Sequence, residues 1–231
     1  MKKIVLIFIF IFFSCEQDES LSLGSLFQDH MILQQDEFVA IWGYTKPRGQ
    51  VFLKTDWGEE KLVNADENGE WNSKIKTLKA DLKPHELVVQ NSSKKIIIKD
   101  IFFGEVWFAS GQSNMGWQMG NKITEVEGAI DEIPLADYNE IRYFRATGND
   151  SYTPNKNVKG SWKVCSPKTA SEFSAVAYFF AKELFNNLQV PIGIIHGTWR
   201  MGHPAEAYAM PELLEKVKGF EKINERIKIS L

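Results

Sequence analysis

"IKDIFFGEVWFASGQSNM", residues 98–115, is the stretch that decides the fold, because an apolar run ends there in a polar turn. Residues 105–109, EVWFA, lack the alternation of a half-buried strand, which predicts a strand buried on both faces. Gly111 supplies backbone freedom for a tight turn that carries Ser113. A serine just past the carboxyl end of such a strand can present its hydroxyl to a ligand. The same serine is also a good helix N-cap, and these residues alone favour the cap.

Short strands separated by turns precede this stretch. Runs of β-branched and aromatic residues predict strands at residues 38–44, 50–55, 70–76, 85–90 and 95–103. The segments between them are rich in Pro, Gly, Asn, Asp and Ser, which favour turns. Strands at this spacing, without helical periodicity between them, predict a small antiparallel β-sandwich over residues 16–102.

Helical and strand patterns alternate after the quoted stretch. Apolar residues recur at steps of three and four across residues 171–188, which predicts a helix, and a buried strand follows at 190–197. A strand, a helix and a strand in this order predict a parallel sheet with helices on its faces. A last amphipathic helix is predicted from about Pro211. The predicted fold class is therefore a multidomain β plus α/β chain, with the second domain at residues 103–231.

The first fifteen residues differ from the rest. Two lysines precede an apolar run at residues 4–13, and Ser14 stands directly before Cys15, which resembles a bacterial lipoprotein signal. The run is shorter than the roughly 20 residues that cross a bilayer. We therefore expect residues 1–15 to act as a signal, with Cys15 lipidated and the protein anchored to a membrane of the bacterial cell envelope, periplasmic or at the cell surface. A plain secretory signal and an uncleaved anchor are the alternatives.

Composition excludes some functional classes. A formal net charge of -3, with both signs interspersed, gives no electrostatic reason to expect nucleic acid as a partner. No cluster of His, Cys, Asp or Glu has the spacing of metal ligands, so no metal is predicted. Cys165 has no adjacent His or CxxC partner, which predicts a small buried thiol rather than a reactive one.

Several motifs, taken in order, resemble the sialate O-acetylesterase family of SGNH-type hydrolases. The motifs are SLFQDHMILQQDEFVAIWGYTKPRGQVFL (25–53), ADENGEW (65–71), the quoted stretch, FSAVAYFFAKEL (173–184) and PIGIIHGTWRMGHPAEAY (191–208). The resemblance covers about residues 23–208. It implies an N-terminal β-domain followed by a flavodoxin-like esterase domain. That domain would remove acetyl groups from sialic acids or related sugars without a cofactor.

The resemblance also implies roles for individual residues. Ser113, within SGQSNM, corresponds to the nucleophile, and Gln112 and Asn114 beside it are expected to contact the substrate. Trp117 could stack on a sugar ring, or it could simply pack over the sheet. In the second block the family's usual Trp-Gly-Gly-Thr is replaced by WRMGH at residues 199–203, so Gly202 is a provisional oxyanion donor.

The catalytic base is the largest departure from the family. Its Asp-x-x-His segment, and the QGE-type block before it, do not occur in these 231 residues. His203 and His196 remain candidates for a substitute base. Because a serine without its base is a weak nucleophile, we expect little esterase activity from this chain alone. The alternatives are a non-catalytic carbohydrate-binding or vestigial lipoprotein, and the first fragment of a split esterase completed by a separate chain.

Overall fold

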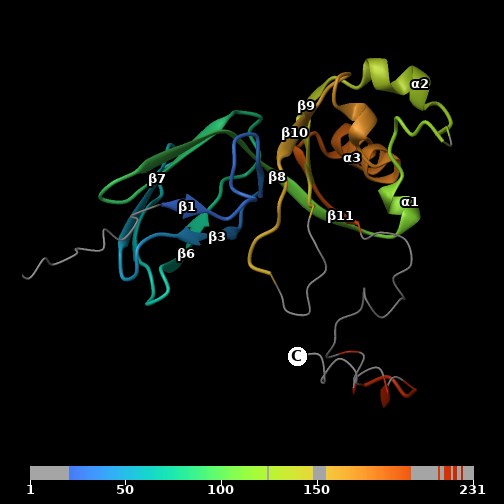
Figure 1. The fold of residues 1–231 in the computed structure, drawn as a ribbon. Helices are drawn as coiled ribbons and strands as arrows, with labels where there is room; N and C mark the ends of the chain where they lie inside the picture. The colour runs from blue at the N-terminus through green and yellow to red at the C-terminus, as the bar shows by residue number, and fades with distance from the viewer. Residues whose placement is uncertain are drawn as a thin grey trace, which may run out of the picture.

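The structure is a computed structural model that describes residues 21–123, 125–147 and 155–198, with a few further positions between 213 and 225 (Figure 1). The signal segment with Cys15, the pair Gly202 and His203, and most of the helix predicted from about Pro211 lie outside the described residues. In the part that is described, no helix has both the length and the apolar character needed to cross a membrane.

The described chain consists of many strands and few helices. The strands are β1 (Ser22–Leu23), β2 (Ile32–Gln34), β3 (Phe38–Tyr44), β4 (Gln50–Thr55), β5 (Glu60–Asn64), β6 (Glu70–Lys76), β7 (His85–Gln90), β8 (Lys95–Gly111), β9 (Tyr138–Arg145), β10 (Trp162–Cys165) and β11 (Ile192–Thr198). The helices are α1 (Ser113–Gly116), α2 (Ala129–Glu132) and α3 (Ala175–Leu188), with 3-10 turns η1 (Ile133–Leu135) and η2 (Ala170–Glu172).

The strands form a small antiparallel sheet and a larger mixed sheet. The small sheet has the order β1-β3-β6, and the larger one has the order β10-β9-β11-β8-β7-β4-β5, with β2 also paired to β8. Strand β11 runs parallel to both of its neighbours, β8 and β9, whereas β7, β4 and β5 continue the sheet in antiparallel pairs. The predicted combination of a β part with an α/β part is confirmed, whereas the β-sandwich and the flavodoxin-like domain stay predictions.

Alternating side chains explain why the N-terminal strands form where the sequence predicts them. In β6, Trp71, Ser73 and Ile75 are buried, whereas Asn72 and Lys74 between them are exposed. The buried faces of both sheets meet in one core, whose members include Leu21, Met31, Ile41, Leu53, Trp71, Ile75, Leu87 and Phe103. Burial of this apolar surface is the main force that holds residues 21–104, the β half, together.

Strand β8 belongs to both halves of the molecule. It is 17 residues long, where the sequence predicts separate strands at 95–103 and 105–109. Its first part pairs with β7, its middle with β2, and its last part, from Glu105 to Gly111, with β11. The predicted domain boundary between residues 102 and 103 lies inside this strand, and the division into two domains stays a prediction.

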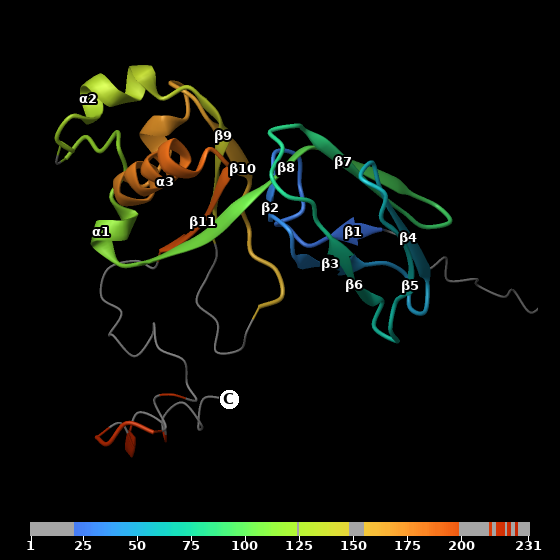
Figure 2. The ribbon, with the colours of Figure 1, turned by 180° about the vertical axis from the view of Figure 1, so that it is seen from behind.

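Helices cover one face of the sheet in residues 105–198, the α/β half. Figures 1 and 2 show α1, α2 and α3 on the same side of β9, β11 and β8. Helix α3 begins at Ala175 rather than at residue 171, because the Ser174 side chain caps it by accepting a hydrogen bond from the Ala177 N–H. Cys165 is fully buried under this layer, and burial raises the pKa of its thiol to about 12, so the predicted buried thiol is confirmed.

A buried ion pair joins β8 to β9. The Arg142 side chain has no exposed surface, and its Nη1 lies 2.8 Å from Oδ2 of Asp100. The Arg142 Nε donates to the Asn139 carbonyl at 2.6 Å, and the guanidinium lies 4.7 Å from the ring centre of Phe102. His30, from the loop before β2, approaches the same carboxylate with Nδ1 at 2.6 Å from Oδ2. Asp100 therefore collects contacts from both halves of the chain.

Candidate functional site

Strands β8 and β11 end side by side at one edge of the sheet. Gly111, the last residue of β8, pairs in register with Thr198, the last residue of β11. Since the carboxyl ends of parallel strands form the usual ligand-binding edge, the segments that follow both strands leave from the same place. The backbone of Gly111 has a φ of 143°, a conformation that residues other than glycine rarely adopt. The chain turns sharply there and delivers Ser113 to this edge.

Ser113 is the first residue of α1 and is exposed. The N-cap position is held by Gln112, which forms no side-chain capping bond, so Ser113 does not act as the cap. Its hydroxyl makes no hydrogen bond with any residue that the structure describes. Gln112 and Asn114 are exposed on either side of it. The geometry leaves the Ser113 hydroxyl available for chemistry, and its role as a nucleophile stays a prediction.

The turn after α1 is held against the start of α3 by backbone hydrogen bonds. Met119 N–H donates to the Phe173 carbonyl at 2.9 Å, and Ala175 N–H donates to the Trp117 carbonyl at 2.8 Å. Trp117 is half-buried beside this contact, and whether its ring meets a sugar stays a prediction. These bonds hold the segment after α1, and the pairing of Gly111 with Thr198 holds the segment before it. Ser113 is therefore fixed in position from both sides.

His196 lies on the side of the sheet that α1 covers. Its Nε2 lies 3.1 Å from the Met115 carbonyl and donates to it, and its ring stacks on Tyr143 with centroids 5.3 Å apart. The residue is 2% exposed, and its Nδ1 is buried without a partner among the described residues. Burial lowers the pKa of His196, which keeps the imidazole neutral. The nitrogen that faces α1 is thus used by Met115 rather than by Ser113.

The burial of His196 predicts a pH dependence of stability. The unfolded imidazole, with a pKa of about 6.5, binds a proton that the folded ring does not. We therefore expect the free energy of unfolding to fall as the pH is lowered through 6.5 towards the lowered pKa of the folded state. His196→Gln, which cannot titrate, should flatten this part of the profile. Urea unfolding at pH 5 and pH 7 measures the difference, and an identical slope in both proteins would contradict it.

Thr198 is a residue of this edge that the sequence did not single out. A Cβ atom added to Gly116 would lie 3.6 Å from the Thr198 Oγ1, which places the threonine side chain against α1. Its position directly after the buried strand predicted at residues 190–197 was the signal that could have found it. No group of three or more His, Cys, Asp or Glu side chains in the described part of the chain converges on a possible metal site.

Comparisons with known proteins identify several relatives of the chain. No protein-family model matches the chain. Sialate O-acetylesterases from Homo sapiens and Pongo abelii are each 27% identical to it over 215 residues, covering 83% of this chain and 40% of the relative. The mouse protein of that name is 27% identical over 198 residues and is covered to 35%. The chain therefore spans about 40% of the length of the curated relatives that it matches.

A solved structure of a carbohydrate acetylesterase is also similar to the chain. The crystal structure of a carbohydrate acetylesterase from Xanthomonas citri superposes with a TM-score of 0.78 at 32% sequence identity. The match covers 84% of this chain and 44% of that one. As its sequence motifs predict, the chain is homologous to the sialate O-acetylesterases over 83% of its own length.

Proposed function

We propose that this chain carries the nucleophile of a carbohydrate esterase that hydrolyses O-acetyl esters on sialic acid or a related sugar. The observation that supports this most is the exposed Ser113 hydroxyl, which neither caps α1 nor bonds to a described residue, at the edge where β8 and β11 end. In the reaction, Ser113 Oγ attacks the acetyl carbonyl carbon and the bond from that carbon to the sugar oxygen breaks. The proton of the serine hydroxyl ends on the sugar oxygen, so the sugar leaves as an alcohol. Water then cleaves the acetyl-serine and releases acetate.

The fold supports the same proposal at a finer level. We interpret the β half as the family's N-terminal β-sandwich and the α/β half as the first part of its flavodoxin-like esterase domain. We assign the Ser113 backbone N–H to stabilisation of the oxyanion, with Gly202 as the second donor that the motif implies. Gln112 and Asn114, exposed beside the nucleophile, are the side chains that we assign to substrate contact.

Activation of Ser113 limits the activity that we expect. His196 is buried and donates its Nε2 hydrogen to Met115, so it is not arranged to take a proton from Ser113. A hydrolytic triad that lacks a member keeps only a residual acceleration of about 10³ to 10⁴ over water. We therefore propose that the chain by itself is an impaired esterase, which gains activity when a base is supplied.

Chemical rescue tests this proposal with the chain as it exists. Imidazole, added as an external base, should accelerate acetate release from an O-acetylated sialic acid, and an acetyl group should accumulate on Ser113, detected by peptide mass spectrometry. Ser113→Ala should abolish both signals beyond the rate of imidazole in solution. Ser93→Ala, which alters an exposed serine in a turn of the β half, should change neither.

Two results would contradict the proposal in different ways. Fast turnover without imidazole that Ser113→Ala abolishes would show that the chain already holds a working base. Rescue that is unaffected by Ser113→Ala, with no acetyl group on Ser113, would remove Ser113 from the role of nucleophile.

A further inference from the structure

The small sheet of β1, β3 and β6 lies in the other half of the molecule from α1, the helix that begins at Ser113 (Figure 1). Its outer face carries a cluster of aromatic and polar side chains. Strands β3 and β6 pair so that Trp42 lies opposite Asn72 and Tyr44 lies opposite Glu70. Cross-strand partners share one face of a sheet, and residues two apart along a strand share it as well. These four side chains therefore form one patch, because the neighbours Ile41 and Trp71 face the core instead.

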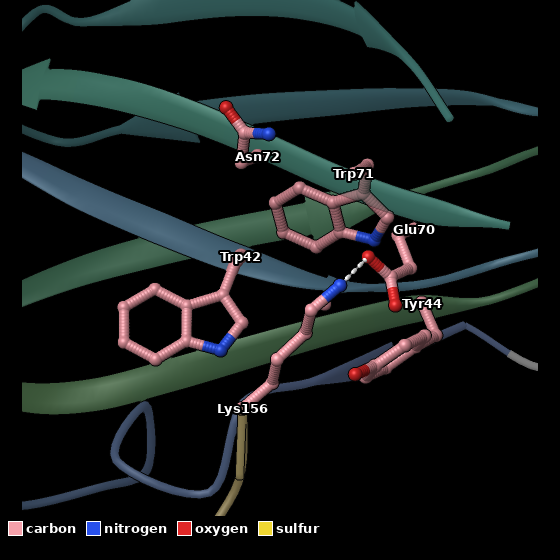
Figure 3. Close-up of a pocket in the computed structure, with 7 residues that line it drawn as sticks. Trp42, Tyr44, Glu70, Trp71, Asn72 and Lys156 are labelled. Atoms are coloured by element: carbon pink, nitrogen blue, oxygen red, sulfur yellow. Dashed lines mark hydrogen bonds and ion pairs between the residues drawn. The ribbon is translucent and has the colours of Figure 1, made fainter. Parts of the chain in front are cut away.

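A pocket of about 290 Å³ opens in this patch (Figure 3). The residues that line it are Trp42, Gly43, Tyr44, Glu70, Trp71, Asn72 and Lys156. Lys156 comes from the segment before β10, and its ammonium forms an ion pair with the Glu70 carboxylate. The two side chains are 65% and 33% exposed, so the ion pair is weak and can open at little cost when a ligand competes for either group.

The aromatic wall of the pocket is fixed before any ligand arrives. Phe27 packs edge-on against Trp42, with ring centroids 4.6 Å apart. Trp71 is 2% exposed and part of the core. Neither the Trp42 nor the Trp71 indole N–H has a hydrogen-bond partner among the described residues, although buried donors are normally satisfied. Both indole nitrogens are buried, so the pocket offers a rigid aromatic surface, and its hydrogen-bonding side chains are those of Tyr44, Glu70, Asn72 and Lys156.

We propose that this pocket binds one sugar residue of a glycan, independently of Ser113. An apolar C–H face of the sugar would lie on Trp42 and Tyr44, whose ring faces carry partial negative charge. Its hydroxyl groups would meet the Glu70 carboxylate and the Asn72 amide, which together accept and donate hydrogen bonds. The Lys156 ammonium would bond to a carboxylate or hydroxyl oxygen of the same sugar.

The size of the pocket supports a sugar over a protein segment. At about 290 Å³ it lies just below the range of small-molecule sites, roughly 300 to 1,000 Å³, which suits a single sugar. A helix or strand of a partner protein would need an extended groove instead, with apolar pockets at regular intervals. The mixture of aromatic rings, one carboxylate, one amide and one ammonium matches a compact ligand that is rich in hydroxyl groups.

Binding of two probes tests the proposal: the α-methyl glycoside of N-acetylneuraminic acid, which is acidic, and lactose, which is neutral. We expect at least one to give saturable binding in calorimetry and a change in tryptophan fluorescence. Trp42→Ala should weaken binding at least tenfold. Asn72→Ala, at an exposed position that the core does not need, should weaken it at least threefold.

Two control variants separate this site from its surroundings. Phe38→Ala removes an aromatic ring that is 62% exposed on the same strand and face but outside the pocket, so binding should not change. Ser113→Ala should also leave binding unchanged. The proposal is overturned if neither probe binds, or if Asn72→Ala and Trp42→Ala both bind as the parent does. Binding that Ser113→Ala abolishes would also overturn it, because the sugar would then sit at the esterase site.

Discussion

Asp100→Asn is expected to lower the free energy of unfolding by about 3 kcal/mol, although the change keeps the shape of the side chain. Arg142 has no exposed surface, and Asp100 is its carboxylate partner at 2.8 Å. Removing one charge of such a pair leaves the other buried and uncompensated, which costs about 3 to 5 kcal/mol. The lower end applies here because the Asp100 side chain is 30% exposed and its field is partly screened. Asparagine also tolerates the positive φ of 56° at this position, so backbone strain does not contribute.

The pH dependence of stability provides a second measure of the same pair. Burial alone would raise the pKa of Asp100, but hydrogen bonds and charge from Arg142 and His30 outweigh burial and lower it. The stabilisation is complete above the unfolded-state pKa of about 3.9 and is lost as the pH falls through the lower folded-state value. Asp100→Asn should therefore lose this acid-sensitive part of the profile. The pH range in which Asp100 affects stability is more acidic than the range in which His196 does.

An exposed ion pair serves as the matched control for Asp100. Arg48 and Glu67 lie 2.7 Å apart, with side chains that are 77% and 81% exposed. Glu67→Gln should change the urea midpoint very little, since pairs of this kind contribute little to stability. If Asp100→Asn unfolded at the same urea concentration as the parent and as Glu67→Gln, the buried pair would have no structural role.

Gly104→Ala is expected to destabilise the chain by about 3 kcal/mol, the upper end of the usual cost of overpacking. An added Cβ would lie 1.9 Å from the carbonyl oxygen of Pro191 and 2.6 Å from its carbonyl carbon. These atoms belong to the backbone that leads into β11, so β11 would have to move away from β8. The Pro191 carbonyl also accepts a hydrogen bond from Glu105 N–H at 2.9 Å, which the shift would weaken. Urea unfolding measures the loss.

Gly197→Ala offers the matched substitution on β11 itself. Its added Cβ would lie 3.2 Å from the ring of Phe108, which is 69% exposed and free to move aside. We expect a loss below about 1 kcal/mol, because the neighbour can adjust without displacing backbone. Equal losses for the two alanines would show that contact with the Pro191 backbone does not control the β8–β11 pairing.

The sequence predicted the elements whose side chains alternate clearly between core and solvent. Strands β3, β4, β6 and β7 begin and end at the predicted residues. Strand β5 was missed, because its residues are exposed or only half-buried and it lies at the edge of the larger sheet. Strand β9 was also missed, because polar residues interrupt its apolar pattern, and one of them, Arg142, is buried through tertiary contacts. Sequence periodicity does not reveal pairing of that kind.

The sequence found the candidate site by its motif but did not supply its geometry. It located the turn at Ser113, yet the residues alone favoured a helix cap, which the backbone assigns to Gln112 instead. Sequence order could not show that His196 bonds to Met115, since the two are 81 positions apart. The roles of Gly202 and His203, lipidation of Cys15 and location in the cell envelope concern residues outside the described part, and they stay predictions.

The continuity of strand β8 through both halves has a consequence for the binding of long glycans. It leaves no linker between the halves, and Phe144 and Trp162 of the α/β half pack into the core of the β half. Continuous strand and shared core packing, rather than a hinge, therefore hold the outer face of β3 and β6 at a fixed separation from the turn at Ser113. If the pocket on β3 and β6 and the turn at Ser113 bind one glycan, the fixed distance between them limits which glycans fit. It would select chains by the number of sugars between the bound residue and the acetylated one.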